Sequence, residues 1–221
     1  MSSLATFEFH CPCCSKDYES ALPTSATTPG LTTTDFFTMA AGEQSIHYQV
    51  YTCPHCGFSC EEMEEGELRD DVRRFVSENI TPQLPEGEEI PSCNKYEFLA
   101  LIDESLGAEP YSLGMLYLHA AWCCYDLKQK ECEKHYRKIA IEYFLKVVGS
   151  EDMDEDLIYL VPYLLGEQYR RTGNEEEAAR WYDLVVEMDV DHSDRGFFMT
   201  LAGQQSLSPK EFMGEIIHEE S

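Results

Sequence analysis

Two pairs of cysteines constrain the fold of this chain more than any other feature. Cys11 lies three positions before Cys14. Further along the chain the same spacing recurs in Cys53 and Cys56. Two intervening residues let the chain turn so that both sulfurs of a pair face one ion, and two such turns supply the four thiolates of a tetrahedral zinc site. The sequence therefore predicts a zinc ribbon held by these four cysteines.

Residues near the two pairs leave alternatives for the ligand set. Cys13 lies inside the first pair, and Cys60 follows the second by four positions. His10 and His55 are further alternatives, since a histidine nitrogen can replace a thiolate on zinc. The two-residue gap favours the four cysteines named above, and we expect both histidines to face solvent or to hydrogen-bond a thiolate. Four protein ligands leave no position for water or substrate, so the predicted site is structural and not catalytic.

Iron is the alternative metal. Residues 51–58 are similar to the second metal-binding turn of rubredoxins, and this resemblance implies an iron-binding electron carrier. However, Ser15 stands where rubredoxins have a glycine after the first pair. An electron carrier also has no need of the long helical region that follows. Zinc is therefore the expected cofactor.

The charge and hydropathy of the chain argue against several classes of protein. Asp and Glu number 42 against 16 Lys and Arg, which gives a net charge of −26. Lys16 is the one basic residue of residues 1–60, so the predicted ribbon has no basic stripe for a nucleic acid. The longest apolar run, residues 157–165, is about half of the ~20 residues that a membrane helix needs. The first residues lack the features of a secretion signal, and the ten cysteines indicate reduced thiols, so we expect a cytoplasmic protein.

Composition divides the chain into three parts. Residues 1–60 form the predicted zinc ribbon, and residues 61–93 combine an acidic helix with a proline-rich linker. Residues 94–221 are helical by periodicity. The predicted fold class is α+β, with a small N-terminal β zinc ribbon followed by an all-α domain of tetratricopeptide-like helical hairpins. We expect the linker to uncouple the core of the ribbon from the core of the helices.

Within the ribbon, each cysteine pair is expected to follow a strand. Residues 7–9 and residues 46–51 alternate apolar and polar side chains, which is typical of a half-buried strand. Residues 23–34 are rich in threonine, serine, proline and glycine, and they predict a loop between ribbon strands that contributes nothing to a core.

Two antiparallel hairpins and a final helix account for the helical region. In the first hairpin, Ser112 is a candidate cap for the first helix. In the second, Gly173 ends one helix and Asn174 caps the next. A final helix is expected to open at Pro209. The second hairpin matches the tetratricopeptide pattern at Leu165, Gly166, Tyr169, Gly173, Ala178 and Tyr182.

Two groups of polar residues in the helices receive structural interpretations. Cys123, Cys124 and Cys132 are expected to be small buried hydrophobes and not a second metal site, because consecutive helical positions point about 100° apart. Glu133 and Arg137 predict an ion pair on a solvated helix face.

The functional prediction for the helical region is a groove for a partner. In tetratricopeptide-like hairpins the first helix of each pair lines a concave face, and here we expect Gln168, Arg170 and Arg171 at exposed positions on it. A protein or peptide with acidic groups suits the arginines, since guanidinium pairs with carboxylate bidentately. The alternative is that both arginines only complement the C-terminal end of their own helix dipole.

Four motifs together resemble a known family. They are the Cys-Pro-x-Cys at residues 11–14, the segment 48–57, the Ala-Trp-Cys at residues 121–123 and the segment 166–174. This pattern resembles an uncharacterised prokaryotic domain-of-unknown-function family that joins a zinc ribbon to tetratricopeptide-like helices. The resemblance covers about residues 7–190, and it implies no activity.

No motif of an enzyme is present in the sequence. We find no HExxH, GxSxG, Walker A or GxGxxG pattern. The chain is therefore predicted to be a zinc-binding, non-catalytic adaptor that binds a protein or peptide on its helical face. The alternatives are a rubredoxin-like electron carrier and an enzyme whose catalytic residues are scattered along the sequence.

Overall fold

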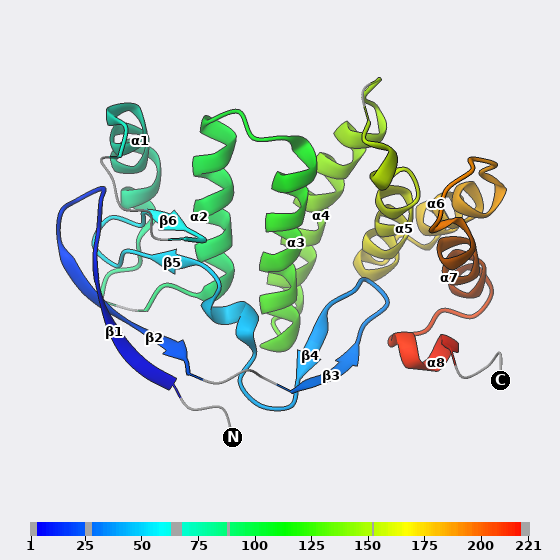
Figure 1. Ribbon diagram of the computed structural model, residues 1–221, viewed down its shortest axis with the longest axis horizontal. Coiled ribbons are helices and arrows are strands. Elements are labelled where there is room, and N and C mark those ends of the chain that lie inside the picture. The colour runs from blue at the N-terminus through cyan, green and yellow to red at the C-terminus, as the bar shows by residue number, and fades with distance from the viewer. Residues whose placement is uncertain (1–3, 25–27, 63–67, 88, 152, 218–221) are drawn as a thin grey trace.

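The computed structural model describes residues 4–24, 28–62, 68–87, 89–151 and 153–217. Antiparallel strand pairs form the N-terminal part, and helices form the rest, so the predicted α+β class is confirmed (Figure 1). Part of the acidic run predicted to lead into the first helix, residues 63–67, lies outside the described residues. The strands are β1 Leu4–His10, β2 Asp17–Pro23, β3 Pro29–Thr32, β4 Thr38–Ala40, β5 Tyr51–Thr52 and β6 Ser59–Cys60. They pair as β1 with β2, β3 with β4, and β5 with β6.

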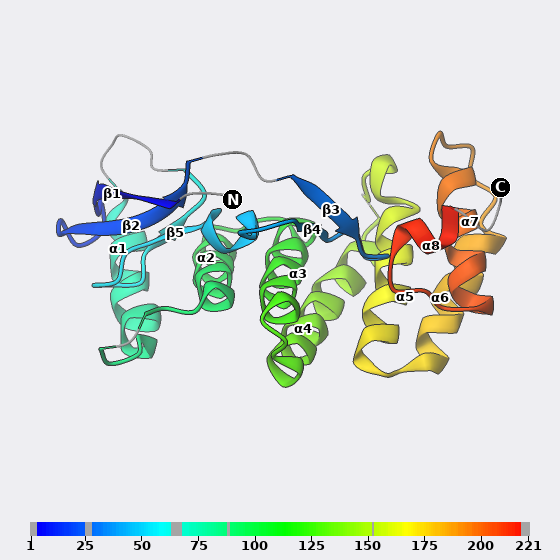
Figure 2. The same cartoon turned by 90° about the horizontal axis from the view of Figure 1, so that it is seen from below.

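Helices stand in a row behind these strands. Each helix from α2 to α7 contacts the next one in the sequence, and Figure 2 shows the strands along one side of the row. The α-helices are α1 Asp70–Phe75, α2 Ser92–Ser105, α3 Pro110–Asp126, α4 Lys130–Val148, α5 Leu160–Thr172, α6 Glu175–Glu187, α7 Arg195–Leu207 and α8 Met213–Ile217. The short helical turns are η1 Ser45–Tyr48, η2 Val76–Ile80, η3 Thr81–Gln83 and η4 Glu155–Leu157.

The turn between α5 and α6 follows the prediction closely. Gly173 ends α5 in the left-handed region at a φ of 89°, which costs glycine little because it lacks a Cβ atom. The Asn174 side chain then accepts a hydrogen bond from the backbone N–H of Glu177 at 3.3 Å. These local contacts fix the α5–α6 hairpin as the sequence indicates.

Three predicted elements differ from the structure. Residues 45–48 form the 3-10 helix η1 and not a strand, because Ile46 and Val50 turn to the same side and are buried against the helices. The first helix of the first hairpin begins at Pro110, two residues before Ser112. Pro209 opens no helix, since α7 ends at Leu207 and α8 begins at Met213. The helix α7 itself was not predicted.

The ribbon and the first long helix share one hydrophobic core. Cys11, Cys53 and Phe58 from the ribbon belong to the same cluster of buried residues as Phe98 and Ile102 of α2. The expected uncoupling of the two cores is therefore wrong for these residues. Side-chain packing between the ribbon and α2 therefore couples their cores, although the proline-rich composition of the segment between them predicts the opposite.

Close approach of α5 and α6 depends on a glycine. A Cβ atom at Gly166 would lie 2.5 Å from Cε1 of the buried Tyr182. We expect Gly166→Ala to lower the free energy of unfolding by about 1–3 kcal/mol, because the helices must separate to make room. Gly203→Ala in α7 is the matched control, since its nearest neighbour, Val186 Cγ2, is 4.0 Å away. Urea denaturation of both variants checks this, and equal effects would contradict it.

A histidine in the helical core predicts acid sensitivity. Burial lowers the pKa of His119 to about 4, and its ring lies against Tyr96 and Trp122. The unfolded chain protonates this imidazole near pH 6.5, so falling pH from about 6.5 toward 4 stabilises the unfolded state. We expect this group to contribute a loss of about 1–2 kcal/mol between pH 7 and pH 5. Denaturation of wild type and His119→Gln at both pH values isolates the contribution, and an identical pH dependence would refute it.

Candidate metal centre

Two turns with the same backbone pattern carry the cysteine pairs. In the β1–β2 turn, the N–H of Ser15 donates to the carbonyl of Cys11 at 2.9 Å. In the β5–β6 turn, the N–H of Gly57 donates to the carbonyl of Cys53 at 2.8 Å. Both donors have positive φ, 57° for Ser15 and 79° for Gly57. The serine therefore adopts the left-handed backbone that its glycine counterpart adopts in the second turn.

The two turns bring four sulfurs together. The Sγ atoms of Cys11, Cys14, Cys53 and Cys56 all lie within 4.8 Å of one another. Across the two pairs, the Sγ atoms of Cys11 and Cys56 are 3.7 Å apart, as are those of Cys14 and Cys53. A tetrahedron with metal–sulfur bonds of about 2.3 Å has edges of about 3.8 Å, so the four sulfurs suit one tetrahedral ion.

The neighbouring candidates lie outside this group of sulfurs. Cys13 and Cys60 are half-buried, and the thiol of Cys13 hydrogen-bonds Cys56, a member of the group. His10 contacts the carboxylate of Asp17 at 2.7 Å, and His55 contacts the carbonyl of Asp17 at 3.2 Å. Arg73 Nη1 donates to the carbonyl of Cys13 at 2.7 Å, which ties α1 to the first turn. Among the described residues near the ribbon, the four predicted cysteines form the group that could hold a metal ion.

Hydrogen bonds among the thiols shift the pKa values of Cys11, Cys53 and Cys56 in different directions. Hydrogen bonds from Cys53 and Cys56 lower the pKa of Cys11. Hydrogen bonding to Cys11 in turn raises the pKa of Cys53 and of Cys56. A cation that binds all four sulfurs must displace the remaining protons, so its affinity falls as the pH is lowered.

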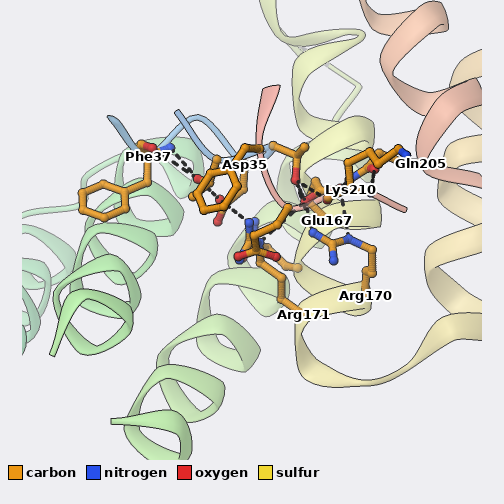
Figure 3. Close-up of polar contacts among 12 residues, drawn as sticks. Asp35, Phe37, Glu167, Arg170, Arg171, Gln205 and Lys210 are labelled. Carbon is orange, nitrogen blue, oxygen red and sulfur yellow. Dashed lines mark hydrogen bonds and ion pairs between the residues drawn. The ribbon is translucent and has the colours of Figure 1, made fainter. Parts of the chain in front are cut away.

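The residues predicted to bind a partner lie in a cluster of polar side chains around α5 (Figure 3). Gln168 is fully buried, and the side chain of Arg171 is only 5% exposed. Arg170 is 17% exposed, and it pairs with the buried Glu167 at 2.8 Å. The prediction that these three side chains are exposed is therefore wrong.

The carboxylate expected from a partner is supplied by the chain itself. Asp35, which directly follows the segment 23–34 predicted to contribute nothing to a core, is fully buried against α3, α4 and α5. Its carboxylate accepts hydrogen bonds from Arg137 Nη1 at 2.7 Å and from Trp122 Nε1 at 2.9 Å. Arg171 Nη2 lies 3.2 Å from the other oxygen. Burial alone would raise the pKa of Asp35, but the two arginines lower it overall.

A second buried carboxylate extends the cluster toward the C-terminus. Glu167 accepts hydrogen bonds from Thr34 Oγ1 at 2.7 Å and from Tyr182 OH at 2.6 Å, and Gln205 of α7 also donates to it. The N–H of Thr34 donates to the carbonyl of Glu211 at 3.1 Å. Segments far apart in the sequence therefore meet over one end of α5.

The sequence contains little that would have revealed this cluster. Glu133 and Arg137 form the predicted pair at 2.8 Å, but Arg137 is fully buried and its guanidinium reaches Asp35. The one available signal was an arginine among the apolar positions of α4.

A hydrogen-bonded histidine lies in a cleft of about 490 Å³ between η1, α2 and α3. The Nδ1 atom of His47 is 2.7 Å from Ser92 Oγ, and its Nε2 atom is 2.9 Å from Asp126 Oδ2. Lys95 and Glu89 also line the cleft. This constellation has no sequence motif, because its members come from three separate elements.

Comparison with known protein families identifies the family to which the chain belongs. Residues 4–199 match the profile of a family described as an uncharacterized protein conserved in bacteria, DUF2225. The chain belongs to this family. The DUF2225 match spans both cysteine turns and the polar cluster on α5, which agrees with the resemblance drawn from the sequence motifs. No curated protein and no solved structure matches the chain. In the described part of this DUF2225 member, no helix is long and apolar enough to cross a bilayer.

Proposed function

We propose that this chain is a zinc-binding, non-catalytic adaptor protein of the cytoplasm. The observation that carries the proposal is the group of four sulfurs contributed by two matching turns. Three of the four cysteines are buried and all four ligand positions of a tetrahedral ion are filled, which suits a structural centre. Such a centre would fasten the strands to α2 and leave the helical row as an interaction surface.

Metal analysis tests the zinc part of the proposal. We expect protein purified after growth with both metals to be colourless and to hold zinc at the four-cysteine site. Four thiolates bind iron as well, and a red protein with thiolate-to-iron charge-transfer bands would overturn zinc and support the rubredoxin-like alternative. Elemental analysis of wild type and of Cys53→Ser gives the metal that belongs to this site.

The adaptor part of the proposal rests on the helical row. Antiparallel helix pairs stacked side by side, as in tetratricopeptide-like scaffolds, present long surfaces for extended segments. Here α5 and its neighbours already bind the turn between β3 and β4 of the chain itself, around Thr34 and Asp35. We propose that a protein partner contacts the part of the helical row left exposed, where Leu184 and Leu207 are among the exposed apolar residues.

Site-specific photo-crosslinking in the native cell tests that surface. A crosslinking amino acid at Leu184 or Leu207 is expected to capture a defined protein partner. The same group at Leu4 or Leu31, which are exposed on strands β1 and β3, is the matched control. Adducts formed only from the strand positions would overturn the helical location.

One observation favours a second candidate function, acyl transfer by a serine nucleophile. His47 joins Ser92 to Asp126 by hydrogen bonds, as the histidine of a serine hydrolase joins its serine and aspartate, but with the two ring nitrogens exchanged, and the three residues line a cleft. Cys123 also hydrogen-bonds Ser92, which fits a structural role for the hydroxyl. Labelling with a fluorophosphonate probe distinguishes the adaptor function from the acyl-transfer function. The adaptor proposal expects no labelling, whereas labelling of wild type that is lost in Ser92→Ala would establish the nucleophile.

A further inference from the structure

A second group of cysteines lies away from the ribbon. Cys93 in α2, Cys124 in α3 and Cys132 in α4 have Sγ atoms that all lie within 4.8 Å of one another. The Sγ atoms of Cys93 and Cys132 are 3.9 Å apart, and those of Cys124 and Cys132 are 2.8 Å apart. Cys124 is buried as predicted and Cys132 is half-buried, but sequence reasoning missed Cys93 and the contacts among the three sulfurs.

The fold gathers these sulfurs from three consecutive helices. Cys124 lies in the last turn of α3 and Cys132 in the first turn of α4, so the short connection between the helices brings them together. Cys93 enters from the first turn of α2. The N-terminus of α2 carries partial positive charge, which favours an anionic ligand at Cys93.

Burial and neighbours suit a soft cation. Cys93 and Cys124 are buried, whereas Cys132 is half-buried and gives the group a side toward solvent. Asn94 Oδ1 lies 3.8 Å from Cys93 Sγ, and the Asn94 amide donates to Glu97 at 2.9 Å. Tyr136 OH donates to the same carboxylate at 2.7 Å. Such polar neighbours orient ligands and balance the charge around a metal site.

We propose that Cys93, Cys124 and Cys132 form a second metal site, which binds Zn²⁺ through three thiolates and keeps its fourth position for an exchangeable ligand. The separation of 3.9 Å between Cys93 and Cys132 is close to the edge of about 3.8 Å expected for tetrahedral zinc. Cys124 and Cys132 must separate by about 1 Å to reach that edge. A site with three protein ligands is open, in contrast to the closed centre of the ribbon.

Cys123 supplies a matched control for this site. It neighbours Cys124 in the sequence and is equally buried, but it hydrogen-bonds Ser92 and lies outside the sulfur group. The full chain, purified under reducing conditions with excess zinc and then desalted, is expected to hold two zinc equivalents. Cys132→Ser should hold one, and Cys123→Ser should hold two.

X-ray absorption at the zinc edge tests the site without any substitution. With both sites loaded, wild type should show a mean sulfur coordination below four, which should rise to four in Cys132→Ser. One zinc equivalent in reduced wild type, with four sulfurs around it, would overturn the second site. A Cys124–Cys132 disulfide that forms in air, combined with no second ion after reduction, would also overturn it and identify the pair as a redox couple.

Discussion

Replacing Cys53 by serine is expected to remove the ribbon's metal ion and to unfold the ribbon. Structural zinc contributes about 10–16 kcal/mol of apparent binding free energy in small zinc-dependent units, so this is the largest effect that we expect from one substitution. Because Cys53 belongs to the same buried cluster as Phe98 and Ile102, the loss should also loosen α2. The helices α5 to α7 should remain folded, since the buried cluster around Tyr163 and Tyr182 contains no residue of α2.

Hydrogen exchange with circular dichroism measures how far the damage spreads. In Cys53→Ser, amides of β5, β6 and α2 should lose protection, while those of α5 and α6 keep it. Cys13→Ser is the control, since this cysteine lies between two members of the ribbon's sulfur group but outside it. Loss of most helical signal in Cys53→Ser would show that the ribbon and all helices unfold as one unit. Zinc retained with four sulfur ligands in that variant would refute the ligand set.

Asp35→Asn is expected to lower the free energy of unfolding by about 3–5 kcal/mol, because it removes the fully buried carboxylate that the buried guanidiniums of Arg137 and Arg171 share. The substitution keeps the volume of the side chain, so the loss reports on charge and hydrogen bonding and not on a cavity. Because the pKa of Asp35 is lowered in the folded state, its contribution is present above the unfolded pKa of about 3.9 and is lost as pH falls below it.

Denaturation of Asp35→Asn and of Asp71→Asn compares the stability lost at a buried ion pair with that lost at an exposed one. Asp71 also pairs with an arginine, Arg69, but both side chains are largely exposed. Little or no change is expected in Asp71→Asn, since solvent screens an exposed pair. Equal stability of the two variants would show that the buried cluster contributes nothing beyond an ordinary surface pair. Arg137→Met combined with Asp35→Ala should recover much of the loss, because apolar residues can replace a buried pair.

The sequence by itself determined the features that depend on neighbours in the chain. Spacing alone identified the four ribbon cysteines, because a turn of two intervening residues brings a pair of sulfurs together whatever surrounds it. Gly173 and Asn174 marked the end of α5 and the start of α6 for a similar reason, since positive φ and side-chain capping act within a few residues. These predictions needed no knowledge of the rest of the molecule.

Only the tertiary structure decided which polar groups are buried and with what they pair. Arg137 and Arg171 carry the same side chain as the exposed Arg69, and nothing local shows that Asp35 comes to lie between them. Cys93 joins Cys124 and Cys132 only because α2 packs beside α3, and α3 beside α4. The physical reason is that the partners of a buried charge or thiol are fixed by tertiary packing. Such packing joins residues such as Thr34 and Arg170, which lie 136 positions apart, and the local sequence pattern is the same whether or not that partner is present.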